Sequence, residues 1–186
     1  MFEKHDNSDQ VRDDQRGFSL IELLIVVAII LIIAAIAIPN LLRAKIAANQ
    51  ASAVQTLRTM TSAEESFSST YNDGFTLSLA QLGGAPGSKT CANAGLIDEV
   101  LSTPPNSKSG YSYVFTPNGS VALAFGVPVT CGVSGDTGYT ISATPTVPGL
   151  TGIASYCVDD TGVIRVNAAG VAIAPPCSTS GFSPLQ

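Results

Sequence analysis

The sequence predicts an α+β fold: a long N-terminal helix, apolar in its first half and amphipathic in its second, packed against an antiparallel β-sheet. Three observations support this prediction. Residues 18–38 are almost entirely apolar, and apolar residues then continue at helical spacing as far as Tyr71. From Gly74 onward, Gly, Pro, Ser and Thr become frequent and apolar residues alternate with polar ones. Neither apolar face can stay exposed, so helix and sheet should pack together.

The charge balance narrows the classes of function. Only 12% of the 186 residues are charged, against roughly 25% in an ordinary soluble domain. Acidic side chains outnumber basic ones by 14 to 9, which gives a net charge of −5. A nucleic-acid-binding surface needs clustered Lys and Arg, so we expect no nucleic-acid partner. The composition predicts a membrane segment that carries one weakly charged head.

The first 39 residues divide into a polar leader and an apolar helix. Residues 1–17 carry five acidic and three basic side chains, which predicts a disordered leader. Residues 18–39 form the predicted transmembrane helix, whose apolar part would span about 31 Å and cross a bilayer core. Arg12 and Arg16 precede this helix and favour a cytoplasmic N-terminus, although basic residues also follow it.

A secretory signal is the alternative for this segment, because Ala35-Ile36-Ala37 fits a small-x-small cleavage pattern. However, the apolar stretch exceeds the roughly 7 to 15 residues of such signals, and the helical pattern continues beyond Pro39. Residues 40–73 are therefore predicted to be the amphipathic helix of the head. Pro39 removes a backbone donor and predicts a kink, although a tolerated membrane-helix proline is equally compatible with the sequence. The predicted apolar stripe contains Leu42, Ile46, Val54, Leu57, Met60, Phe67 and Tyr71.

Glu22 is the one ionisable side chain in the apolar segment. A charged residue at mid-bilayer costs about 2.5 to 3.5 kcal/mol on insertion scales, and less near the headgroups. No Lys or Arg lies between Glu22 and Arg43. A partner must therefore come from the chain's own N-terminal end, where Arg16 is the simplest choice, or from another molecule.

Three segments resemble a known family. Residues 16–27 (RGFSLIELLIVV) resemble the type IV prepilin signature, in which a Gly-Phe junction precedes a Glu at the fifth position of the mature chain. Residues 35–40 (AIAIPN) resemble the proline region of type IV pilin helices. Residues 156–165 (YCVDDTGVIR) resemble, more loosely, the last hairpin of some bacterial pilin heads.

The resemblance implies a type IV pilin-like fold and a processing pathway. A prepilin peptidase would cut between Gly17 and Phe18 on the cytoplasmic face and N-methylate Phe18. In a homopolymeric helical filament, Glu22 would pair with the cationic amine of Phe18 on the adjacent subunit, which relieves the cost of an isolated carboxylate. Glu22 and Pro39 are therefore the expected assembly residues. The precursor would be a single-pass protein of the bacterial inner membrane, in contact with its pilus assembly machinery, and the assembled pilus would be extracellular.

The head, residues 74–186, should be rich in β-structure. Two short helices are expected at Leu77–Leu82 and Leu96–Leu101. Residues 111–116 and 120–125 flank Pro117-Asn118-Gly119, which predicts a hairpin. The remaining expected elements are a strand at 140–144, a hairpin of 155–158 with 163–166, and an edge strand at 171–174.

The four cysteines, Cys91, Cys131, Cys157 and Cys177, suit disulfides formed in an oxidising compartment. Three connectivities are open, and buried free thiols are the alternative. From proximity we favour Cys157 with Cys177 and Cys91 with Cys131. No C-x-x-C pair occurs and the one histidine is His5, so we expect no metal site of the zinc type.

We expect no catalytic residue, cofactor or metal in this chain. No nucleophile has an evident base. Asp136, Asp159 and Asp160 lack the dense ligand spacing of a calcium loop and are expected to lie in solvated turns. Asn118-Gly119-Ser120 fits an N-glycosylation sequon, but a turn explains it better.

The favoured function is a structural subunit of a type IV pilus, a surface filament that serves twitching motility, adhesion or DNA uptake. A major pseudopilin of a type II secretion system shares the N-terminal signature and is the first alternative. The head lacks the calcium-binding acidic loop which that family implies. A single-span anchored binding domain or enzyme is the second alternative, and Glu22 opposes it because an isolated anchor does not need a carboxylate there.

Overall fold

The computed structural model describes residues 18–72, 74–85, 87, 90–119, 135–171, 177 and 183–185. The predicted leader, residues 1–17, lies outside the described residues. The chain separates into two compact units, Met1–Asn40 and Leu41–Gln186, which are described one at a time.

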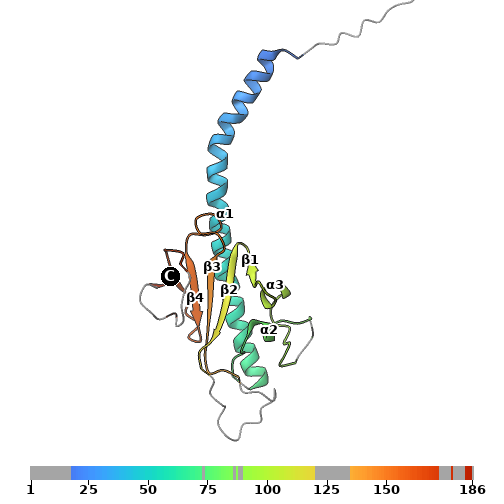
Figure 1. Cartoon of the computed structure of the whole chain (residues 1–186), viewed down its shortest axis with the longest axis vertical. Coiled ribbons are helices and arrows are strands. Elements are labelled where there is room, and N and C mark those ends of the chain that lie inside the picture. Colours follow the sequence, from blue (N-terminus) through green and yellow to red (C-terminus); the bar gives the residue numbers. More distant parts are fainter. Residues whose placement is uncertain are drawn as a thin grey trace, which may run out of the picture. The chain divides into compact units, whose positions relative to one another are not determined.

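The predicted long helix is confirmed as α1, Leu20–Tyr71, which is unbroken at Pro39 (Figure 1). In the first unit every described side chain except that of Ala34 is exposed. By length and composition α1 could cross a membrane. In the second unit the apolar stripe becomes a buried face. Its buried apolar members are Ala53, Leu57, Met60, Ala63, Phe67 and Tyr71.

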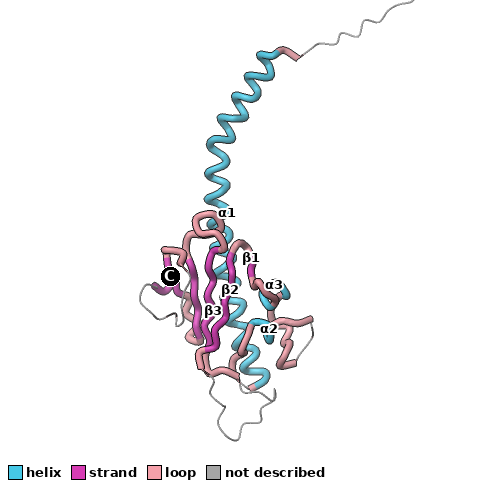
Figure 2. The backbone as a smooth tube through the Cα atoms, viewed as in Figure 1, coloured by secondary structure: helices cyan, strands magenta, loops and turns pink. Residues whose placement is uncertain are grey.

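The described residues of the second unit form a six-stranded antiparallel sheet in the order β1-β2-β3-β4-β5-β6. Its strands are magenta in Figure 2. Each strand pairs with its neighbours in the sequence, so the sheet is a simple meander. Its strands are β1 (Ser107–Lys108), β2 (Tyr111–Pro117), β3 (Tyr139–Pro145), β4 (Ser155–Asp159), β5 (Arg165–Asn167) and β6 (Ser183–Pro184). Long helix and antiparallel sheet together confirm the predicted α+β, type IV pilin-like fold.

One core joins the helix to the sheet. The buried face of α1 contributes Leu57, Met60 and Phe67, and the sheet contributes Tyr111 and Ile141. Burying a large aliphatic or aromatic side chain stabilises the fold by about 1.5 to 3 kcal/mol each. This face of α1 is therefore what holds the head together.

The chain does not form the tight turn predicted at Pro117-Asn118-Gly119. Pro117 pairs with Tyr139, the Asn118 N–H donates to the Gly138 carbonyl at 2.9 Å, and the Thr137 N–H donates to the Gly119 carbonyl at 3.5 Å. The ladder between β2 and β3 thus runs on through Asn118 and Gly119. The predicted tight turn there is wrong, because long-range pairing with β3 outweighs the local turn propensity of Pro-Asn-Gly. The predicted strand at 120–125 lies outside the described residues.

The other short elements match the predictions with bounds shifted by a few residues. The helices are α2 (Leu79–Leu82) and α3 (Glu99–Ser102). The predicted strand at 140–144 is β3, and the hairpin of 155–158 with 163–166 is β4 paired with β5. Of the expected edge strand at 171–174, Val171 is not in a strand and the rest lies outside the described residues. The last strand of the described sheet is β6.

The predicted disulfide between Cys157 and Cys177 is confirmed, with Cα atoms 5.8 Å apart. It fastens β4 to the chain 20 residues further on. Cys91 is also disulfide-bonded, and Cys131 lies outside the described residues. No described cysteine is a free thiol, so the alternative of buried thiols is wrong for these three.

Candidate assembly site

The N-terminal end of α1 places Glu22 beside the start of its own helix. The Ser19 backbone N–H donates to Glu22 Oε2 at 3.0 Å, and Ser19 directly precedes the first helical residue, Leu20. This is half of a capping box, in which an acidic side chain in the first turn returns to the residue that caps the helix. The carboxylate is thereby fixed at the positive end of the helix dipole.

The Ser19 N–H is not among the partners expected for Glu22 from the sequence. The spacing Ser19-x-x-Glu22 is a known capping-box pattern and could have identified it from the sequence. The expectation that the partner is either Arg16 or another molecule is therefore incomplete, because a backbone N–H of the same helix already binds one oxygen. Among the described residues, Glu22 forms no ion pair.

A continuous apolar surface surrounds this carboxylate. Phe18 and Leu20 are each 80% exposed, and the aliphatic side chains that follow along the first unit are about half exposed or more. Such a surface is far too apolar to remain in water. It can be covered by lipid or by other apolar helices. Pro39 lies exposed at the end of this surface, inside α1.

A second carboxylate, Glu64, lies fully buried in the core of the head. Its two oxygens accept hydrogen bonds from Thr76: the hydroxyl donates to Oε1 at 2.5 Å and the backbone N–H donates to Oε2 at 2.9 Å. Burial raises the pKa of Glu64, and the two hydrogen bonds from Thr76 oppose that rise. Glu64 thus ties the segment after α1 to the buried face of the helix.

The position of Glu64 could have been predicted, although its partner could not. Glu64 lies seven residues after Leu57 and seven before Tyr71, two residues of the apolar stripe. This spacing places Glu64 on the buried face of the helix. The adjacent carboxylate, Glu65, lies on the exposed face.

The buried Glu64 predicts a pH-dependent stability. Because its folded-state pKa is raised above 4.5, the folded protein holds the proton more tightly than the unfolded chain. The Glu64 contribution should be most favourable below pH 4.5 and should decline as the pH rises through the folded-state pKa. Glu64→Gln should remove this decline. The measurement is urea unfolding in detergent across that pH range.

Glu65→Gln is the matched control, because it removes the adjacent, exposed carboxyl group of the same helix. It should follow the wild-type pH profile. A Glu64→Gln profile parallel to that of wild type would contradict the assignment.

The aspartates considered for calcium have local structural roles. Asp136 and Asp159 are buried, which corrects the expectation of solvated turns. Asp136 Oδ1 accepts a hydrogen bond from the Gly138 N–H at 3.3 Å, and Asp159 Oδ1 accepts one from the Thr161 N–H at 3.2 Å. Within the described residues no three His, Cys, Asp or Glu side chains cluster as metal ligands would.

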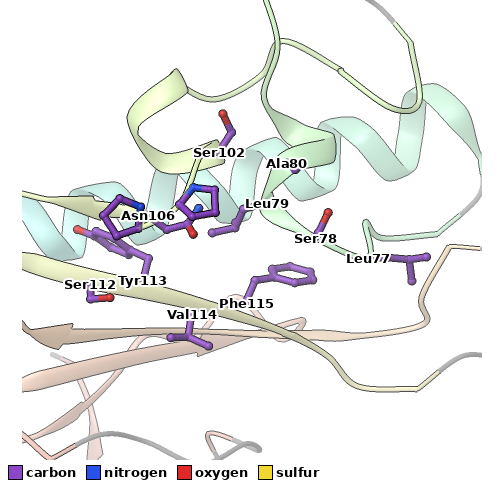
Figure 3. A pocket seen from close by; sticks show the side chains of 12 residues that line it. Leu77, Ser78, Leu79, Ala80, Ser102, Asn106, Ser112, Tyr113, Val114 and Phe115 are labelled. Carbon is purple, nitrogen blue, oxygen red and sulfur yellow. The ribbon is translucent and has the colours of Figure 1, made fainter.

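A cavity of about 400 Å³ lies between α2, the segment after α3 and β2 (Figure 3). Leu79 and Phe115 form part of its apolar wall, and Ser102 and Asn106 contribute polar groups. Among the described residues that line it, there is no carboxylate, histidine, lysine or cysteine.

The structure places only part of the predicted site. Phe18, Glu22 and Pro39 are described, whereas Gly17 lies outside the described residues. Phe18 and Glu22 lie at the same end of one helix, and Pro39 lies nearly five turns further along it. The roles of these residues in cleavage, methylation and assembly stay predictions.

Comparison with known proteins supports the class that this geometry indicates. Residues 12–38 match the family model of the prokaryotic N-terminal methylation motif. The matched residues include the start of the long apolar helix α1, where the sequence resembles the type IV prepilin signature.

A curated relative also indicates similarity to the type IV pilins. The chain is 52% identical over 52 residues to the type IV major pilin protein PilA of Myxococcus xanthus (strain DK1622). The match covers 28% of this chain and spans only 24% of the relative's length. No solved structure matches the chain. The resemblance to the type IV pilins is thus confirmed.

Proposed function

We propose that the chain is the precursor of a structural subunit of a type IV pilus. The precursor is anchored in the bacterial inner membrane by residues 18–39, with its N-terminus in the cytoplasm. A prepilin peptidase cuts it after Gly17 and methylates the new terminal amine of Phe18. The pilus assembly machinery then adds the subunit to a homopolymeric surface filament. Twitching, adhesion and DNA uptake are the roles that such a filament would serve.

The observation that carries this proposal is Glu22 on the exposed apolar surface of α1. A carboxylate in this position lowers the affinity of an isolated anchor for lipid. It becomes favourable when a cation from a neighbouring molecule pairs with it away from water. The methylated amine of Phe18 in the next subunit is such a cation, and the Ser19 N–H leaves Glu22 Oε1 available for it.

The apolar surface supports the same proposal. Lipid covers the side chains from Leu20 to Ile38 in the precursor, and the corresponding helices of neighbouring subunits cover them in the filament. Both environments are apolar, so transfer between them needs little free energy from the hydrophobic effect. The paired charge then favours the filament and fixes the position of one subunit relative to the next.

Mass spectrometry of sheared surface filaments tests this proposal. We expect the chain to be the main component, to begin at Phe18, and to carry one methyl group on its terminal amine. Filaments that lack the chain, or a chain that retains residues 1–17 in the filament, would overturn the proposal.

A substitution at the junction tests the processing step. Gly17→Val should leave uncut precursor in the inner membrane, because a branched side chain obstructs the peptidase at the scissile bond. Immunoblotting of membrane fractions should show one band at the precursor size and no surface filaments. Asn7→Val, elsewhere in the leader, is the control and should be processed normally. Normal processing of the Gly17→Val variant would contradict the assigned junction.

A further inference from the structure

The loop between β3 and β4, residues 146–154, forms a tight turn against α1. The Thr151 N–H donates to the Val147 carbonyl at 2.9 Å, and the Gly149 N–H donates to the Gly152 carbonyl at 2.8 Å. The Asn49 side-chain amide donates to the Thr151 carbonyl at 2.8 Å, which fixes the loop beside the start of the head's helix. The loop is therefore held in place rather than free to fold inward.

This loop keeps aliphatic side chains in solvent. Val147 is 48% exposed, and Leu150 and Ile153 are each 56% exposed. Gly170 packs against the Ile153 carbonyl so closely that a Cβ there would lie 2.3 Å from it, and the next residue, Val171, is 57% exposed. We call Val147, Leu150, Ile153 and Val171 the proximal patch.

The proximal patch lies at the end of the second unit where the chain enters it. β3 finishes and β4 begins at this end, beside Asn49. Along α1, Asn49 is seven residues beyond Leu42, the last residue of the exposed apolar segment, a rise of about 10 Å. The headgroup layer on each side of a bilayer is roughly 5 to 7 Å thick, so aliphatic side chains projecting from the loop can reach it.

The charges at this end suit an anionic surface. Arg43 and Lys45 are exposed on α1 beside the entry point, whereas no carboxylate occurs in residues 41–63, 137–158 or 161–171. Lys108, in β1, is already paired with Asp98 at 2.6 Å. The described acidic side chains of the second unit are Glu64, Glu65, Asp98, Glu99, Asp136, Asp159 and Asp160.

We propose that the proximal patch, together with Arg43 and Lys45, docks the head on the headgroup layer of an anionic membrane before polymerisation. The aliphatic side chains enter the boundary between headgroups and acyl chains, and the two cations pair with anionic headgroups. This inference rests on the proposed membrane insertion of residues 18–39. The docked head is held at the surface until assembly withdraws the subunit from the membrane.

The absence of tryptophan from the chain makes a sharp test possible. Three single-tryptophan variants of the full chain, Ile30→Trp, Leu150→Trp and Val163→Trp, are reconstituted in vesicles of phosphatidylethanolamine and phosphatidylglycerol with brominated acyl chains. Bromine quenches tryptophan fluorescence only at close range. Ile30 reports membrane insertion, and Val163, an exposed aliphatic residue after the far end of β4, is the matched control for Leu150.

We expect strong quenching at position 30, intermediate quenching at position 150 and none above background at position 163. Quenching at position 150 should fall when phosphatidylcholine replaces phosphatidylglycerol, and also in the Arg43→Gln, Lys45→Gln double variant. Ile153→Trp should be quenched to the same extent as Leu150→Trp. Agreement between the two shows that the quenching does not come from a distortion caused by one substitution.

Equal quenching at positions 150 and 163, with strong quenching at position 30, would overturn the docking proposal and leave membrane insertion intact. No quenching at position 30 would overturn the membrane insertion itself. A blue-shifted but unquenched signal at position 150 that grows with protein density would also overturn docking, because a second copy of the chain would then cover the patch.

Discussion

Replacing Glu22 with valine should abolish surface filaments while the precursor is still inserted and cut normally. The substitution removes the charge that is proposed to pair with the Phe18 amine of the next subunit, and it makes the apolar helix more favourable in lipid. Electron microscopy of cell surfaces measures filaments, and membrane fractionation with immunoblotting measures insertion and processing.

A second variant, Glu22→Gln, separates the role of Glu22 in capping the helix from its proposed role in ion pairing. Glu22→Gln keeps an oxygen that can accept the Ser19 N–H but has no charge. If assembly depends on the ion pair, Glu22→Gln should fail to assemble, as Glu22→Val does. Glu65→Gln, an exposed carboxyl in the head, is the control and should form normal filaments. Normal filaments from Glu22→Gln would show that the cap is sufficient and would defeat the pairing argument.

Thr76→Val should clearly destabilise the head. The substitution keeps the shape of the side chain but removes the donor that lies 2.5 Å from Glu64 Oε1, in a site without access to water. Hydrogen bonds to charged groups contribute about 1.5 to 3 kcal/mol, and an unsatisfied buried acceptor adds to the loss. We therefore expect a cost of about 2 to 3 kcal/mol, or a melting temperature lower by roughly 5 to 10 °C.

Near-UV circular dichroism in detergent measures this effect, because the buried tyrosines report on head packing. Thr59→Val is the matched control. The Thr59 hydroxyl donates to the Gln55 carbonyl on an exposed face of α1, the helix that contains Glu64. The free energy of unfolding should therefore change by no more than about 0.5 kcal/mol. Adding Glu64→Leu to Thr76→Val should recover part of the loss, since the carboxylate is removed as well. Equal melting temperatures for Thr76→Val and Thr59→Val would refute the role given to Glu64.

The long helix was predictable because its cause is local. The apolar run of residues 18–38 and the stripe through Leu57 and Met60 repeat at helical spacing over the full length of α1. The hairpin of β4 and β5 was predictable for a similar reason, since its turn contains Asp159 and Gly162, and Gly162 has a φ of +72°.

The features that could not be predicted depend on contacts between distant parts of the chain. The pairing of β2 with β3 continues through Asn118 and Gly119, and no local pattern reveals that Gly138 is their neighbour. Likewise, the position of Glu64 on the helix is visible in the sequence, whereas the donation from Thr76 depends on how the chain returns after α1. At the candidate assembly site, the sequence predicts a carboxylate in the apolar segment, but the proposed pairing of Glu22 with another molecule lies outside a single chain.

The two end strands of the described sheet have a consequence for how copies associate. β1 and β6 are each only two residues long; β1 contains the charged Lys108 and β6 contains Pro184, which has no N–H to donate. Short, charged or proline-containing edges discourage strand-to-strand addition between molecules, the route that leads to amyloid-like aggregates. In the proposed precursor and filament, many copies of the chain lie close together, and these short edges protect them from such pairing. Association is then left to the proposed contacts of the N-terminal helix.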